Sequence, residues 1–281
     1  MKKFLLWFRI IRPQTLFASL CPVVVALLTM TEAITSWPVA IVTIVCALAL
    51  QVLSNLINDY YDFVRGTDKK GRAGFKRALA EGEVSKKQMQ TACLLVLAIC
   101  VICGLYLVFE GGWVILAIGA TAILFAWLYT ATSHSLSYLG IADIFVFLYY
   151  GVIAAAGTYY LQTKGFSCPV FYAGAVSGLI SMCVLLINNL RDMDDDRAVG
   201  KRTLPVRFGR NAGLGLMLLV VLLMPVMAYL AFGLSLTLAV VIPGLSLFFA
   251  VTKAKGATYN RCLMAAGLIN VFYTILVALS V

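Results

Sequence analysis

Long apolar segments constrain this chain more than any other feature of its sequence. Each of nine segments is long enough to cross the hydrocarbon core of a bilayer as a helix. They cover residues 14–31, 38–60, 89–109, 113–131, 140–162, 170–189, 212–232, 235–252 and 262–280. Hydrophobic residues make up 62% of the chain and charged residues 12%, about half the charged share of soluble domains. Continuous rather than alternating hydrophobicity argues against a membrane β-barrel. We therefore expect an all-α, polytopic membrane protein with about nine transmembrane helices, folded as one domain over residues 1–281.

The distribution of basic residues predicts the orientation in the membrane. Of the 22 Lys and Arg residues, 21 lie at the amino end or in the loops after the second, sixth and eighth segments. Lys164 alone lies on the other side. By the positive-inside rule the amino terminus is cytoplasmic and the carboxyl terminus is outside. Because topology accounts for the net charge of +10, we expect no nucleic-acid partner.

Polar residues interrupt the end of the second apolar segment at helical spacing. Gln51, Asn55, Asn58 and Asp62 recur at intervals of three or four residues, which places them on one face of a helix. A buried carboxylate is costly in lipid, so this face is expected to point into the protein or into a wet cavity.

A second acidic cluster follows the sixth segment and resembles the first. Asp192 and Asp196 are four residues apart, as Asn58 and Asp62 are. In both clusters the run Leu-Ile-Asn, at 56–58 and 186–188, is followed four residues after its Asn by an Asp. Because the two segments are four helices apart, the match indicates a possible four-helix quasi-repeat with parallel topology.

Carboxylate and amide oxygens gathered at one membrane face form a hard-ligand site. Mg²⁺ suits such a site, because a few carboxylates hold it while water and substrate phosphates complete its shell. Nearby Arg and Lys side chains bind phosphate oxygens. These features predict a diphosphate held between two acidic helix ends with an apolar tail in the membrane, as in a polyprenyl diphosphate. A single acidic run is usually a solvated loop, but two matched clusters at one face favour a binding site.

The two acidic motifs resemble those of the UbiA superfamily of intramembrane aromatic prenyltransferases. They read Asn58-Asp59-Tyr-Tyr-Asp62 and Asp192-Met-Asp-Asp-Asp196 here. Within the superfamily the chain is most similar to the branch that prenylates 1,4-dihydroxy-2-naphthoate in menaquinone synthesis. The stretches that carry this similarity are 12–16, 53–68, 138–143, 157–162, 188–192 and 200–209.

The resemblance implies a magnesium-dependent transfer of a polyprenyl group from polyprenyl diphosphate to the naphthoate, with release of diphosphate and CO₂. It also implies a bacterial cytoplasmic membrane, contact with membrane lipid, and an active site at the cytoplasmic face. The residue roles that it implies are metal binding by Asn58, Asp62, Asp192 and Asp196, catalysis by these carboxylates with Asp68 and Asp143, and substrate binding by Arg12, Arg77, Lys201 and Tyr129.

Other interpretations remain open at several of these positions. The three basic residues also fit ordinary positive-inside charge, and Asp143 also fits a helix cap. His134, the only histidine, is expected to be an exposed loop residue. The sequence departs from the family pattern at 74–77, at 131–134 and at Ala142, near the expected acceptor, so 4-hydroxybenzoate is an alternative acceptor. A cation-coupled transporter is a remote alternative, because its polar residues are expected at the bilayer midplane.

Overall fold

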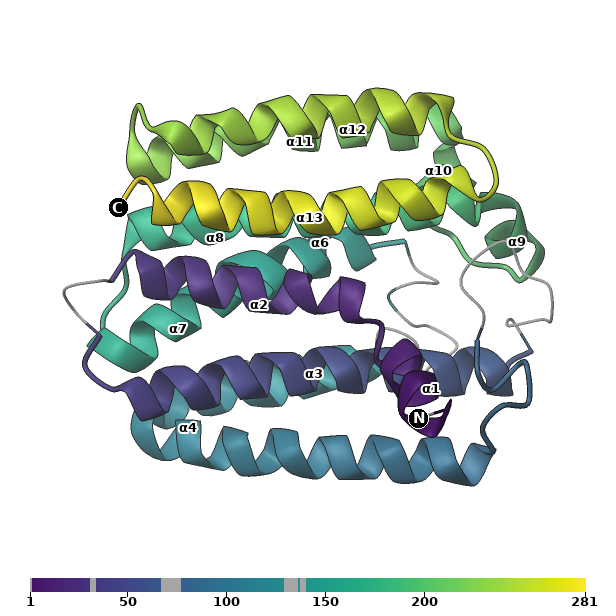
Figure 1. The fold of residues 1–281 in the computed structure, drawn as a ribbon, viewed down its shortest axis with the longest axis horizontal. Helices are drawn as coiled ribbons and strands as arrows, with labels where there is room; N and C mark the ends of the chain where they lie inside the picture. Colours follow the sequence, from purple (N-terminus) through teal and green to yellow (C-terminus); the bar gives the residue numbers. More distant parts are fainter. Residues whose placement is uncertain (1, 31–33, 67–76, 129–135, 137–139) are drawn as a thin grey trace.

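The protein is a bundle of long helices (Figure 1). Its structure is a computed structural model that describes residues 2–30, 34–66, 77–128, 136 and 140–281. Every regular element in these ranges is helical. The elements are α1 (Lys2–Ile11), α2 (Pro13–Leu28), α3 (Trp37–Val64), α4 (Lys86–Leu128), α6 (Ala142–Phe147), η1 (Leu148–Val152), α7 (Ile153–Thr163), α8 (Cys168–Arg191), α9 (Met193–Ala198), α10 (Leu204–Phe208), α11 (Arg210–Phe232), η2 (Leu236–Val240), α12 (Val241–Lys253) and α13 (Thr258–Ala278).

The helices long and apolar enough to cross a membrane number seven in the described ranges, or eight with the bent pair α1–α2. The sequence predicted nine segments, and α4 spans two of them, 89–109 and 113–131. Gly112 interrupts α4 with φ 63° and ψ −150°, a backbone conformation that is essentially restricted to glycine. Leu107 and Ile115, on either side of this break, belong to one packed cluster, because the chain turns back there.

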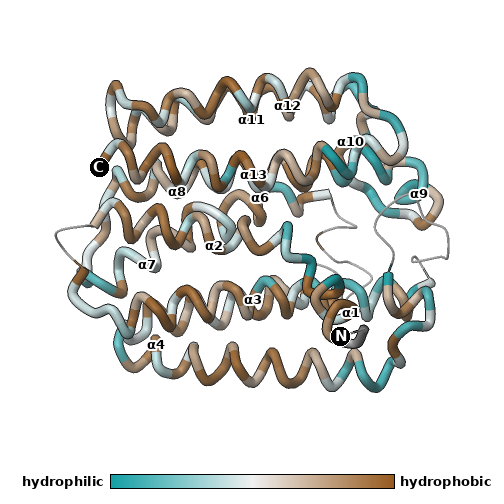
Figure 2. The backbone as a smooth tube through the Cα atoms, in the orientation of Figure 1, coloured by the Kyte–Doolittle hydropathy of each residue, from teal (hydrophilic) through white to brown (hydrophobic). Residues whose placement is uncertain are grey.

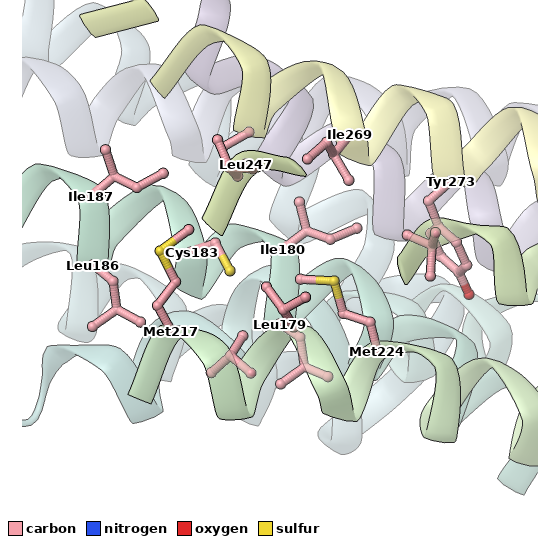
Figure 3. Close-up of a cluster of buried hydrophobic side chains, with 14 of the residues drawn as sticks. Leu179, Ile180, Cys183, Leu186, Ile187, Met217, Met224, Leu247, Ile269 and Tyr273 are labelled. Carbon is pink, nitrogen blue, oxygen red and sulfur yellow. The ribbon is translucent and has the colours of Figure 1, made fainter. Parts of the chain in front are cut away.

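The largest hydrophobic cluster lies around α8, which is the most deeply buried span (Figure 3). Side chains from α11, α12 and α13, among them Met217, Leu247 and Tyr273, pack against it. The Tyr273 hydroxyl donates a hydrogen bond of 3.1 Å to the carbonyl of Ala173, which sets the register of α13 on α8.

Glycines let α8 approach the segment α6–η1–α7 closely. A Cβ at Gly178 would lie 2.4 Å from the Phe147 carbonyl oxygen, and one at Gly151 would lie 2.5 Å from the Gly178 Cα. Small residues allow such close backbone contact between membrane helices. The π-helical turn η1, which contains Tyr149 and Tyr150, lies at this contact; such turns are frequent at functional sites.

Hydrophilic residues gather at the end of the bundle that carries α9 and α10, and apolar residues dominate its middle (Figure 2). The amino-terminal helix α1 lies toward this polar end, and the carboxyl terminus lies at the opposite end (Figure 1). The fold thus brings both acidic helix ends, those of α3 and α8, to the same end of the molecule.

Candidate active site

One cavity of about 570 Å³ connects the polar end of the bundle with its apolar interior. At the polar end its wall includes Asn58 and Asp62 from α3 and Asp192 and Asp196 from the other acidic cluster. The deeper wall is mainly apolar and comes from α2, α3, both arms of α4, α7, α8 and α13. The two clusters, about 130 residues apart in sequence, therefore meet at one site, as the sequence predicted.

The polar stripe of α3 faces the protein interior, as its helical spacing predicted. Gln51, Asn55 and Asp62 are 6%, 6% and 3% exposed. Asn55 Nδ2 donates hydrogen bonds of 2.9 Å to the Ile11 carbonyl and to Thr15 Oγ1. This part of the stripe therefore anchors the junction between α1 and α2.

The junction between α1 and α2 aims Arg12 toward α3. Arg12 adopts the left-handed conformation with φ 57° before Pro13, and the two helices bend by 52°. Its guanidinium donates to Asp59 Oδ1, and Arg77 donates to the same oxygen. Asp59 is 3% exposed and lies behind the cavity wall, whereas both arginines line the cavity. Asp59 therefore holds two cations at the mouth of the site.

Arg191 organises the second acidic helix end. Its Nε and one terminal nitrogen donate hydrogen bonds of 2.7 and 2.8 Å to the two carboxylate oxygens of Asp192. Its terminal nitrogens also donate to Asn188 Oδ1 at 2.5 Å and to Asn260 Oδ1 at 2.9 Å. Such a two-pronged arrangement fixes the orientation of both partners. Asn260 belongs to α13, so this contact couples α13 to the end of α8.

Asp196 lies one helical turn beyond Asp192, on α9, and pairs with Lys201. The distance from Lys201 Nζ to Asp196 Oδ1 is 3.3 Å, and both side chains are largely buried. Both residues line the cavity. Each acidic end of the site thus contains carboxylates together with basic side chains.

The oxygen atoms at the polar end fit a magnesium ion. In the described part of the chain, Asn58 Oδ1 is buried and has no hydrogen-bond partner. The carboxylates of Asp62, Asp192 and Asp196 line the same cavity, and carboxylate and amide oxygens are the ligands that Mg²⁺ prefers. Among the described residues, no three or more His, Cys, Asp or Glu side chains are grouped so that they alone could hold a metal ion.

Three residues of the predicted site, Asp143, Asp68 and Tyr129, are not placed at the cavity by the structure. Asp143 is buried at the first turn of α6, but it is not among the described residues that line the cavity. Asp68 and Tyr129, like His134, lie outside the described residues. All three roles stay predictions.

Aromatic side chains form part of the cavity wall near α6. Phe125 contacts Phe145 and Tyr149, with ring centroids 4.5 and 5.1 Å apart, and all three rings line the cavity together with Tyr150. Tyr60 and Tyr61, inside the first acidic motif, do not line the cavity among the described residues; their rings contact each other, and Tyr61 also contacts Trp127.

Asp59, Arg191 and Asn260 were not assigned roles from the sequence. Asp59 stands inside the first acidic motif and Arg191 directly precedes the second, and their charge next to the motif aspartates was the available signal. Asn260 has no comparable signal, because only the packing of α13 against α8 brings it to Arg191.

Comparison with known proteins identifies relatives over most of the chain. Residues 19–276 match the model of the UbiA prenyltransferase family. The 1,4-dihydroxy-2-naphthoate octaprenyltransferase of Escherichia coli is 34% identical over 218 residues, which cover 72% of this chain and 68% of that protein. The enzyme of the same name from Mycobacterium leprae is 35% identical over 211 residues, covering 74% and 71%.

Solved structures share the fold at low sequence identity. A UbiA homolog from Archaeoglobus fulgidus, bound to GPP and Mg²⁺, superposes with a TM-score of 0.70 at 17% identity. The match covers 98% of this chain and 99% of that one.

Proposed function

The chain belongs to the UbiA prenyltransferase family and is an aromatic prenyltransferase of the membrane, and from this premise we propose its reaction in detail. Its relatives support prenyl transfer to a naphthoate acceptor in menaquinone synthesis. In our proposal the donor is a polyprenyl diphosphate, the acceptor is 1,4-dihydroxy-2-naphthoate, and diphosphate and CO₂ are released.

The observation that carries this proposal is the division of one cavity into two chemical halves. Among the described residues, four cations and three carboxylates line the polar end, and the deeper wall is apolar and lies among membrane-spanning helices. A molecule with a charged diphosphate and a long hydrocarbon tail matches both halves. The volume of about 570 Å³ lies within the range of small-ligand sites.

The basic residues of the cavity neutralise the leaving group in this proposal. Arg12, Arg77, Arg191 and Lys201 donate hydrogen bonds to diphosphate oxygens, which become more negative as the allylic C–O bond breaks. Donors oriented in advance toward developing charge stabilise a transition state more than they stabilise the substrate.

Asn58, Asp62, Asp192 and Asp196 would hold the magnesium ion, and Asp68 would contribute a further carboxylate. When bound there, Mg²⁺ supplies Lewis-acid stabilisation of the diphosphate. Arg191, which also donates a hydrogen bond to Asn260, fixes the orientation of Asp192, and Lys201 pairs with Asp196.

The aromatic residues of the wall would shield the allylic carbocation. Ring faces attract a cation within about 6 Å, and Phe125, Phe145 and Tyr149 already line the cavity as a group. Tyr129 is proposed to contribute to the same shield. We assign Asp143 to the acceptor side, where it would contact or help to deprotonate a hydroxyl group.

Topology follows from the same proposal. We propose nine spans, with the two arms of α4 counted separately, and an amino terminus and polar cavity end at the cytoplasmic face of a bacterial membrane. The water-soluble naphthoate then enters from the cytoplasm, while the prenyl tail stays among the membrane-spanning helices.

A product assay tests the proposal. Membranes that carry the protein receive a polyprenyl diphosphate, Mg²⁺ and 1,4-dihydroxy-2-naphthoate, with 4-hydroxybenzoate in a parallel reaction, and mass spectrometry identifies the lipid products. We expect a prenylated, decarboxylated naphthoquinol that disappears with EDTA. Asp62→Asn should lower the rate at least 100-fold, because it removes a proposed metal ligand.

Asp194→Asn is the matched control for that substitution. Asp194 belongs to the same acidic run as Asp196, but its side chain is 88% exposed, so the rate should stay within twofold of wild type. A product found only with 4-hydroxybenzoate would overturn the acceptor, and full activity in EDTA would overturn the metal.

A further inference from the structure

Two carboxamide side chains lie deep in the wall of the cavity, away from its charged end. Asn270 on α13 is 1% exposed and Gln51 on α3 is 6% exposed, and both line the cavity. Among the described residues, Asn270 Oδ1 and Gln51 Oε1 have no hydrogen-bond partner. Polar groups inside a membrane protein are costly unless they are satisfied, so such groups commonly mark a ligand site.

The two carboxamides lie at a similar distance from the charged end of the cavity. Asn270 lies ten residues beyond Asn260 along α13, and Gln51 lies seven residues from Asn58 along α3. At 1.5 Å per residue they lie about 10–15 Å below the charged end of the cavity. Helix α2 packs against both α3 and α13 and lies between them (Figure 1), so the two side chains flank α2.

Hydrogen bonds fix which end of the Gln51 amide lacks a partner. Its Nε2 donates to Thr15 Oγ1 at 3.1 Å and to Asn55 Oδ1 at 3.4 Å. The oxygen is therefore the atom left without a partner. An amide oxygen accepts hydrogen bonds and cannot donate them. Any ligand group that satisfies it must carry an O–H or N–H.

The need for a hydrogen-bond donor distinguishes the acceptor from the other ligands of the proposed reaction. A prenyl tail carries no hydrogen-bond donor, and an ionised diphosphate offers acceptor oxygens. The dihydroxy aromatic ring carries two hydroxyl donors at opposite positions. The ring must also lie next to the first carbon of the prenyl group to form the new C–C bond. It therefore lies on the apolar side of the diphosphate, toward the interior of the cavity.

We propose that Asn270 and Gln51 form the acceptor-binding subsite, in which each carboxamide oxygen accepts a hydrogen bond from one hydroxyl group of the dihydroxy aromatic substrate. This inference rests on the proposed function and adds the residues that read the acceptor. A site with two amide acceptors discriminates against a ring that lacks one hydroxyl, because one buried oxygen is then left without a partner.

A comparison of two ligands in two proteins tests the subsite. The ligands are 1,4-dihydroxy-2-naphthoate and 1-hydroxy-2-naphthoate, which lacks one hydroxyl, and the binding of each is measured as a KM or an inhibition constant. In the wild type we expect the dihydroxy compound to bind at least tenfold more tightly. In Asn270→Leu or Gln51→Met, which remove the amide at similar volume, this preference should fall below threefold in at least one variant. The KM for the prenyl diphosphate should stay within twofold.

Thr274→Val provides the matched control on the same helix. Thr274 lies one turn beyond Asn270, its hydroxyl donates to the Asn270 carbonyl, and it does not line the cavity among the described residues. We expect the wild-type preference in this variant. Size-exclusion chromatography in detergent shows whether each variant folds. Because the two positions lie on separate helices, the test remains valid if one variant does not fold.

Three outcomes would count against the subsite. An unchanged preference in both folded variants would mean that buried water, rather than the acceptor, satisfies these oxygens. An increased KM for the prenyl diphosphate alone would place the tail there instead. A wild type that binds the diphosphate but prenylates neither compound would refute the proposed acceptor, and not the hydrogen-bonding role alone.

Discussion

At the scale of single residues, Asp59 is the side chain on which the arrangement of the cavity mouth depends. It receives hydrogen bonds from Arg12 and Arg77 on one oxygen, and it lies behind the wall that the two arginines form. Removing one partner of a buried ion pair leaves the other charge uncompensated, which typically costs 3–5 kcal/mol. Asp59 is therefore a positioning residue rather than a proposed ligand.

Asp59→Asn should raise the KM for the prenyl diphosphate about tenfold and lower the free energy of unfolding by about 3 kcal/mol. The reason is that Arg12 and Arg77 lose their shared counter-charge and their orientation. Steady-state kinetics and thermal unfolding in detergent measure the two effects. Glu83→Gln is the control, because Glu83 pairs with Arg9 at 38% exposure, where an ion pair contributes about 1 kcal/mol or less. Equal effects of the two substitutions would contradict this role.

The sequence indicated which motif residues share a helix face better than it indicated the contacts those residues make. Spacing at helical intervals placed Asn58 and Asp62 on an inward face, because that pattern depends only on local geometry. The pairing of Arg12 with Asp59 and of Arg191 with Asn260 joins positions 47 and 69 residues apart. Such contacts follow from tertiary packing, which a single sequence does not encode locally.

At the scale of elements, the close contact between α8 and η1 sets the position of the aromatic wall. Gly178→Ala should lower the free energy of unfolding by about 1–3 kcal/mol, because its Cβ would lie 2.4 Å from the Phe147 carbonyl oxygen. Gly104→Ala on α4 is the matched control, since nothing lies within 4 Å of its Cβ and alanine favours a helix by up to about 1 kcal/mol. Thermal unfolding in detergent compares them, and a Gly178→Ala variant as stable as wild type would contradict the packing.

Apolar length predicted where the long helices lie but not how they are joined. Segments such as 38–60 and 170–189 correspond to α3 and α8, because an uninterrupted apolar run of this length fits a membrane helix. The short helices α9 and α10 fall in a stretch that the sequence analysis treated as a loop. Both are too short for a hydropathy signal, and α9 is also strongly polar, so their formation depends on packing at the polar end.

At the scale of the whole molecule, the termini lie at opposite ends of the bundle (Figure 1). With a cytoplasmic amino terminus, a carboxyl-terminal alkaline phosphatase fusion should be active and a carboxyl-terminal green fluorescent protein fusion should be dark. Fusions after Arg202, in the basic loop beyond α9, should give the reverse pattern. A fluorescent carboxyl-terminal fusion would mean an even number of spans and would contradict the proposed topology.

The ion pairs at the polar end of the cavity have a consequence for how ligands bind. The proposed metal ligands Asp192 and Asp196 hold the protein cations Arg191 and Lys201, so these carboxylates have counter-ions within the protein. Loading such a site is an ion exchange: a carboxylate that accepts a metal releases its arginine or lysine, and the released cation then needs an anion. Under the proposed function, metal and diphosphate would therefore bind synergistically, because each would lower the free-energy cost of binding the other.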